Sequence, residues 1–150
     1  MTGLGIKEPK NVLAKVGTPI GHVIDQCGGF AGTPGKVIMG GPMTGWAQKD
    51  LSAAVVKGTS GILVLTVDEV EYGAERQCVG CDKCIEVCPV FLMPNFIVKH
   101  TKRGQYKKAN VYGAQDCFEC GCCAYVCPSR ISHVAYVRKA KAEIAAAEKK

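Results

Sequence analysis

The stretch from Cys78 to Pro89, CVGCDKCIEVCP, places four cysteines at offsets 0, 3, 6 and 10 and follows the last of them with a proline. The stretch from Cys117 to Pro128, CFECGCCAYVCP, repeats both the offsets and the final proline. The chain therefore contains an internal repeat of one ligand-type motif. Of its ten cysteines only Cys27 lies outside this region, so a special site is expected in the second half of the chain.

The spacing within each motif indicates an iron–sulfur ligand set. Three cysteines three residues apart let a tight loop wrap a cubane and reach three irons, whereas the fourth points away and serves the other cluster in two-cluster ferredoxins. We therefore expect two 4Fe-4S clusters with crossed ligands. The set expected for cluster 1 is Cys78, Cys81, Cys84 and Cys127, and the set expected for cluster 2 is Cys117, Cys120, Cys123 and Cys88.

Other uses of these cysteines are weaker interpretations. Zinc sites are often built from paired CxxC units, but zinc gives no reason for two identical quartets that each end in proline. Catalytic thiols need a neighbouring base, and His100 and His133 are expected to be surface or helix residues, neither of them a ligand. A purely structural role for the clusters differs from electron transfer in whether they reduce and reoxidise reversibly.

Single residues around the motifs also carry expectations. Only one of the adjacent Cys122 and Cys123 can match the offset of Cys84, and Cys123 holds that place, so Cys122 is expected to be a spare thiol that turns away from the cluster. Gly80 and Gly121 should let main-chain N–H groups approach the sulfurs and tune their potential.

Length and composition limit the remaining classes of function. The 150 residues suffice for two small modules. The chain opens without an apolar export signal, and its longest apolar runs are too short to span a bilayer, so we expect a soluble or peripheral protein without disulfides. The formal net charge of +6 could steer an acidic electron carrier, a membrane surface or a nucleic acid. Bound clusters would lower that charge, which leaves nucleic-acid binding poorly supported. Much of the charge comes from Lys99, Lys102, Arg103, Lys107, Lys108 and the Lys-rich C-terminal end.

The first half of the chain predicts a small mixed α/β module. A helix is expected from Thr18, its capping residue, through Pro19 to Cys27, which should be a core residue. Strands are expected at residues 36–39, 54–57 and 62–66, the last two joined by a hairpin-like connection at 58–61. The glycine-rich segment 40–45 lacks the ending of a phosphate loop and is interpreted as a structural turn.

The second half, from a boundary near Gly73, shows no β periodicity. Helices are expected from Pro94 onward, over residues 105–112, and from Ser132 into the Ala-, Glu- and Lys-rich tail. Because residues 89–116 separate the two motifs, helical insertions are favoured over a compact β-rich ferredoxin.

With both halves considered, the chain resembles the C subunit of the Rnf electron-transport complex, a ferredoxin:NAD oxidoreductase coupled to ion pumping. The resemblance covers most of the chain. It is carried by VGTPIGHVIDQCGG from Val16, KVIMGGPMTG from Lys36, VVKGTSGIL from Val55, and the two cysteine motifs. It implies an α+β chain with a soluble-ligand-binding β-grasp (SLBB) module at residues 1–72 and a helical ferredoxin module with two 4Fe-4S clusters at residues 73–150. The family's flavin- and nucleotide-binding domain has no match here, so a C-terminal fragment or truncated form is expected.

The resemblance also implies a function and a location. The chain should relay electrons between a flavin/NADH domain, where FMN and NADH would bind upstream, and a membrane-associated partner. Its partners would be other subunits of the complex and a ferredoxin-like redox protein, at the cytoplasmic face of the inner or plasma membrane. The propanediol-utilisation cobalamin reductase is similar across the same motifs, and its likeness implies that the β-grasp module binds a small ligand such as a cobalamin. Alone, the chain is not expected to be catalytic.

Overall fold

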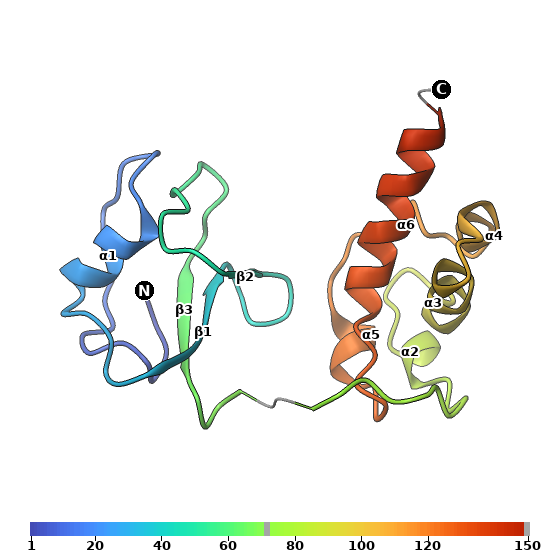
Figure 1. Ribbon diagram of the computed structural model, residues 1–150, viewed down its shortest axis with the longest axis horizontal. Coiled ribbons are helices and arrows are strands. Elements are labelled where there is room, and N and C mark those ends of the chain that lie inside the picture. Colours follow the sequence, from blue (N-terminus) through green and yellow to red (C-terminus); the bar gives the residue numbers. More distant parts are fainter. Residues whose placement is uncertain (71–72, 149–150) are drawn as a thin grey trace. The chain divides into compact units, whose positions relative to one another are not determined.

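The computed structural model describes residues 1–70 and 73–148 and divides the chain into two compact units, Met1–Tyr72 and Gly73–Lys150. The first unit holds a small antiparallel sheet with one helix, and the described part of the second contains helices and loops (Figure 1). The α+β class is therefore confirmed.

The sheet of the first unit has the strand order β2-β1-β3. Strand β1 (Pro34–Met39) pairs antiparallel with β2 (Trp46–Gln48) on one side and with β3 (Ile62–Thr66) on the other. The strands expected at 36–39 and 62–66 are confirmed, whereas β2 was not predicted. Residues 40–45 form the turn between β1 and β2, as their glycines indicated, and Gly40 adopts a φ of +105° there.

Helix α1 (Ile20–Gln26) packs its apolar face into the core of the first unit. Ile20, Ile24 and Cys27 are almost fully buried, so the assignment of Cys27 to the core is confirmed. The expected cap was wrong: Pro19 occupies the capping position and no side chain caps the helix. The N–H groups of Ile20 and Gly21 instead donate to the carbonyl oxygens of Ala53 and Leu51, which removes the need for the Thr18 hydroxyl.

The strand expected at residues 54–57 was also wrong. Val55 exchanges backbone hydrogen bonds with the chain just before α1, at Gly17 and Thr18, and only Ala54 forms an isolated bridge. A turn follows in which the Thr59 hydroxyl accepts from the Val56 amide. Since β3 pairs with β1, residues 58–61 do not form a hairpin.

The second unit gathers short helices around α6 (His133–Glu148), with α3 (Pro94–Lys102) and α4 (Tyr106–Val111) beside it (Figure 1). The helices expected after residues 94, 105 and 132 are confirmed, and Pro94 stands at the start of α3 as predicted. The single-turn helices α2 (Lys83–Glu86) and α5 (Cys122–Tyr125) lie within the cysteine motifs. The core of the unit consists of Ile97, Ala109, Ala114, Val137, Ala140 and Ile144.

The segment after Gly73 is held against these helices by Glu75. Its carboxylate pairs with Lys102 of α3 and accepts hydrogen bonds from the Tyr136 hydroxyl and the Ser132 amide. The Arg76 amide also donates to the Ser129 carbonyl oxygen at 2.9 Å. The chain therefore enters the first cysteine motif along the segment that follows the second.

Candidate metal centres

The two cysteine motifs repeat in backbone conformation as well as in sequence. Each enters the left-handed region at the same three offsets from its first cysteine, and each forms its single helical turn, α2 or α5, at the same place. The matched positions are Gly80 and Glu119, Asp82 and Gly121, and Phe91 and Arg130. Because left-handed backbone costs a residue with a side chain about 1–2 kcal/mol, its recurrence at non-glycine residues indicates that the loop shape is imposed by the site.

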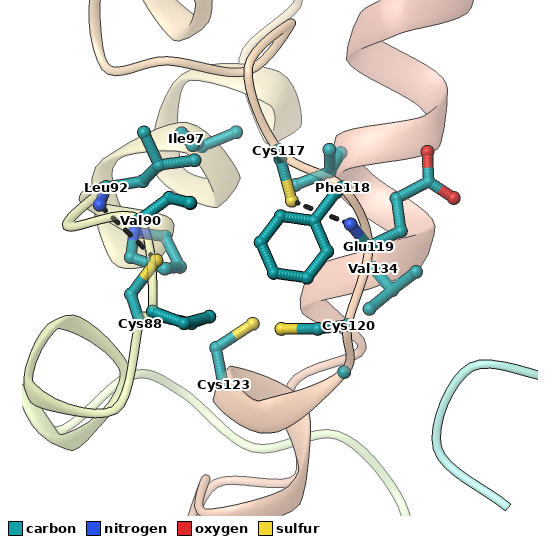
Figure 2. A pocket seen from close by; sticks show the side chains of 14 residues that line it. Cys88, Val90, Leu92, Ile97, Cys117, Phe118, Glu119, Cys120, Cys123 and Val134 are labelled. Atoms are coloured by element: carbon teal, nitrogen blue, oxygen red, sulfur yellow. Dashed lines mark hydrogen bonds between the residues drawn. The ribbon is translucent and has the colours of Figure 1, made fainter.

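One cavity collects the cysteines expected for cluster 2. Cys117, Cys120 and Cys123 of the second motif line it together with Cys88 of the first. Figure 2 shows the sulfurs of Cys120 and Cys123 facing each other, with Cys117 on the loop that carries Phe118 and Cys88 on the opposite loop. The rest of the lining is largely apolar and comes from Pro89, Val90, Leu92, Pro94, Ile97, Phe118, Glu119, Gly121, Val134 and Val137.

Main-chain amides donate to two of these sulfurs. The Leu92 N–H lies 3.3 Å from the Cys88 Sγ, and the Glu119 N–H lies 3.4 Å from the Cys117 Sγ (Figure 2). Such N–H···S bonds stabilise negative charge on a thiolate and tune a bound cluster. The sequence predicted that Gly80 and Gly121 ease such an approach, but the amides that donate here belong to Leu92 and Glu119. Glu119 is itself the residue with left-handed backbone between Cys117 and Cys120.

A second cavity collects the cysteines expected for cluster 1. Cys78, Cys81 and Cys84 of the first motif line it together with Cys127 of the second. Cys78 and Cys81 are exposed, whereas Cys84 is buried. The other lining residues of this cavity are Val79, Asp82, Lys83, Asn95, Pro128, Ser129, Ile131 and His133. Each cavity thus takes three cysteines from one motif and the fourth from the other.

Burial sets the protonation state of the inner thiols. Burial raises the pKa of Cys84 and Cys117, and it raises the pKa of Cys123 to about 12. These side chains are therefore neutral thiols in the metal-free chain. A coordinated thiol is deprotonated by the metal, so loading either cavity releases protons.

Cys122 differs from its neighbour. It is half-buried, and among the described residues it lines neither of the two cysteine cavities. A hydrogen bond with the Cys120 side chain is the main cause of its raised pKa. Its sulfur therefore lies near a cluster-2 cysteine but outside the cavity.

The two histidines are placed by the helices that carry them. His100 lies in α3, and its Nδ1 is 2.9 Å from Gln105 Oε1. His133 begins α6 and is almost fully buried beside the cluster-1 cavity, with its Nδ1 2.9 Å from the Ile131 carbonyl oxygen. The expectation of a surface or helix residue is confirmed for both, since each lies in a helix. Burial lowers its pKa, which favours the neutral ring.

Glu119 is a residue at the site that the sequence did not single out. It pairs with Arg138 at 2.6 Å and with Lys141 at 3.2 Å, both on α6, and Lys141 also donates to the Cys117 carbonyl oxygen. Burial alone would raise the pKa of Glu119, but hydrogen bonds from these two cations hold that pKa below its usual range. The pairs fasten the second cysteine loop to α6. No sequence pattern links positions so far apart in the chain.

The donor sets fit cubane clusters. Each cavity presents four thiols from two loops, which is the ligand number of a 4Fe-4S cluster. Within residues 1–70 and 73–148, no three His, Cys, Asp or Glu side chains gather closely enough to hold a single metal ion.

Comparison with known proteins finds matches in both units of the chain. A family model described as a 4Fe-4S dicluster domain matches residues 77–131, and one described as an SLBB domain matches residues 1–47. The chain is 44% identical to the C subunit of the Na(+)-translocating ferredoxin:NAD(+) oxidoreductase complex of Acetobacterium woodii, over 99% of this chain and 34% of that protein. It is 42% identical to the C subunit of the ion-translocating oxidoreductase complex of Methanosarcina acetivorans, over 93% of this chain and 31% of that protein.

The chain is a homologue of the Rnf C subunit. A third relative, the C subunit of the proton-translocating ferredoxin:NAD(+) oxidoreductase complex of Clostridium ljungdahlii, is 43% identical over 73% of this chain and 24% of that protein. The chain thus spans about a third or less of the length of these Rnf C subunits. Among its described residues, no helix combines the length and apolar character needed to cross a membrane.

Proposed function

We propose that this Rnf C homologue binds two 4Fe-4S clusters and transfers electrons through them. Cluster 1 would be held by Cys78, Cys81, Cys84 and Cys127, and cluster 2 by Cys117, Cys120, Cys123 and Cys88. The observation that carries the proposal is the pair of cavities, each lined by three cysteines of one motif and the fourth of the other. The exchange of fourth ligands is the pattern of two-cluster ferredoxins.

When bound, such clusters accept and donate single electrons, and the protein sets their potential, spacing and access. The chain contributes an apolar lining around the cluster-2 site and amide donors to Cys88 and Cys117. The crossed ligands require the two motifs to fold together. The ion pairs of Glu119 then fix the second loop against α6.

We further propose the place of the chain in a larger assembly. It would relay electrons between a flavin/NADH domain and a membrane-associated partner in an Rnf-type ferredoxin:NAD oxidoreductase, at the cytoplasmic face of the membrane. The names of the relatives, which are C subunits of ion-translocating complexes, support this role. FMN and NADH would bind in a domain that these residues do not include. In this scheme residues 1–72 form the SLBB module and residues 73–150 the ferredoxin module.

An anaerobic redox titration tests the proposal. The reconstituted chain should take up about two electron equivalents, show EPR signals of reduced 4Fe-4S clusters, and return the electrons to a mild oxidant with its iron retained. Iron that is present but cannot be reversibly reduced would leave the clusters a structural role and contradict electron transfer. Metal-free chain taken through the same steps is the control.

A further inference from the structure

A groove beside the cluster-1 cavity carries a concentration of positive charge. It runs along α3 in the second unit, with a volume of about 510 Å³, and one of its walls contains the exposed Cys78. Lys99, Lys102 and Arg103 line it from the end of α3. The other residues that line the groove are Gln77, Gly80, Asn95, Phe96, Val98 and Ile131. None of the described residues that line it carries a carboxylate.

Two of the three cations remain available for a ligand. Lys102 is paired with Glu75, but none of the ion pairs in the described part of the chain involves Lys99 or Arg103. Lys99 and Arg103 are both exposed and stand four residues apart, which puts them on one face at the end of the helix. The Lys99 ammonium lies 5.8 Å from the centre of the ring of Phe96, which also lines the groove.

The surroundings of the cluster-2 cavity have the opposite character. No cation is among its described lining residues, and Arg138 and Lys141, which contact its lining residue Glu119, are both paired with that carboxylate. Two strongly exposed aromatic side chains stand at or near it: its lining residue Phe118 is 57% exposed, and Phe91, three residues after Cys88, is 90% exposed. Among the described residues that line the groove and the two cysteine cavities, the cations therefore lie on the Cys78 side of the unit, and none lines the cavity that contains Cys88.

We propose that this groove, termed the α3 groove, docks a redox protein with an acidic face around a one-electron centre. The inference rests on the proposed function, because it takes Cys78 as a cluster ligand. One electron passes between the partner's centre and cluster 1, so one is oxidised as the other is reduced, and no bond forms or breaks. Cys78 is the exit point because it is a ligand that is both solvent-exposed and part of the groove wall.

Charge complementarity selects this occupant. Lys99 and Arg103 lie at the surface, where attraction acts over about a Debye length and speeds encounter more than it strengthens the final complex. A transient electron-transfer partner needs this combination of fast association and easy release. The apolar floor formed by Phe96, Val98 and Ile131 supplies a dry contact beneath the charged rim.

Binding and electron transfer test the proposal with an acidic plant-type ferredoxin as the probe. The double variant Lys99→Gln/Arg103→Gln removes the two groove cations that lie outside ion pairs. The matched control, Lys107→Gln/Lys108→Gln, removes two exposed lysines of α4 that do not line it and produces the same change in net charge. Calorimetry with the oxidised ferredoxin gives Kd, and stopped-flow mixing with the reduced ferredoxin gives the second-order rate constant.

At low ionic strength the groove variant should raise Kd and lower the rate constant about tenfold, whereas the control should change both less than about twofold. At about 0.5 M salt the three proteins should converge. Equal losses in the two variants would reduce the effect to net charge and overturn the proposal. So would a salt-independent rate, or Lys99-dependent binding of ATP or pyrophosphate that blocks the ferredoxin, since either result assigns the groove to another ligand.

Failure of docking and failure of the proposed function give different results. If dithionite yields reduced-cluster EPR signals in every variant but ferredoxin shows no preference for the α3 groove, only the docking inference is wrong. If no reducible cluster can be loaded into the parent chain, the proposed function itself fails, although binding of oxidised ferredoxin to the groove can still be measured.

Discussion

Serine substitutions at the adjacent Cys122 and Cys123 test which of them belongs to the cluster-2 site. Cys123 is 9% exposed and lines the cluster-2 cavity, whereas Cys122 is half-buried and lines neither cavity among the described residues. Cys123→Ser should remove one of four ligands and leave a hydroxyl group in a largely apolar space. Cys122→Ser should change only a side chain that lies outside the cluster-2 cavity.

The magnitude follows from the cluster stoichiometry. Two cubanes contain about eight irons per chain, so Cys123→Ser should retain about four and Cys122→Ser about eight. The EPR signal that survives in Cys123→Ser should be the one assigned to cluster 1. The Cys122→Ser spectrum should match that of the parent.

Iron analysis of anaerobically reconstituted protein, visible absorbance and EPR of the reduced state are the measurements. Far-UV circular dichroism of both variants shows whether each is folded. Because Cys122 lies close to Cys120, the double variant is included to detect replacement of the lost ligand by Cys122. Equal iron loss in the two single variants, greater loss in Cys122→Ser, or about eight irons in both Cys123→Ser and the double variant would refute the assigned register.

Three further predictions concern other parts of the chain. The flavin-free chain should not reduce dyes with NADH, because hydride chemistry needs a flavin and a nucleotide site; robust NADH-driven dye reduction would contradict this. Ile24→Ala, in the first core, should lower the free energy of unfolding by about 2–5 kcal/mol in urea titrations, whereas the fully exposed Leu13→Ala should change it by less than about 0.5 kcal/mol. The hydrogen bond from Lys102 lowers the pKa of Glu75, so its contribution to stability is present above the unfolded-state pKa and is lost as pH falls through the lower folded value; Glu75→Gln should flatten the acid loss of thermal stability below about pH 4.5, and an unchanged pH profile would count against it.

The sequence predicted the features of the fold that depend on local patterns. The apolar spacing of residues 20–27 predicted α1, and Pro94 predicted the start of α3. The β-branched runs that become β1 and β3 were equally clear. In these segments the residues that set local conformation also face the core, so one pattern carries both signals.

Errors arose where distant backbone decides the outcome. Val55 and Val56 have strand-like side chains, but their segment is used to satisfy amides before and at the start of α1 and has no strand partner of its own among the described residues. Strand β2 was missed because Trp46, Ala47 and Gln48 form a short, mostly exposed edge with no alternating pattern. Pairing across the sheet determines both results, and neither segment reveals its partner.

The cysteines of the candidate site could be predicted from the sequence, whereas the ion pairs that hold the cysteine loops in place could not. Cysteine spacing alone suggested the two quartets because the loop geometry is nearly fixed by the ligands. The pairs of Glu119 with Arg138 and Lys141, and of Glu75 with Lys102, join residues separated by long stretches of chain. Spacing carries no information about such contacts, and they emerge only once α6 and α3 are packed.

The central claim is that the chain holds two 4Fe-4S clusters, and metal analysis of the anaerobically reconstituted protein tests it most directly. The account predicts about eight irons and about eight acid-labile sulfides per chain, with broad brown absorbance that bleaches on reduction. About four irons would contradict the second cluster, and bound zinc without a visible chromophore would contradict both.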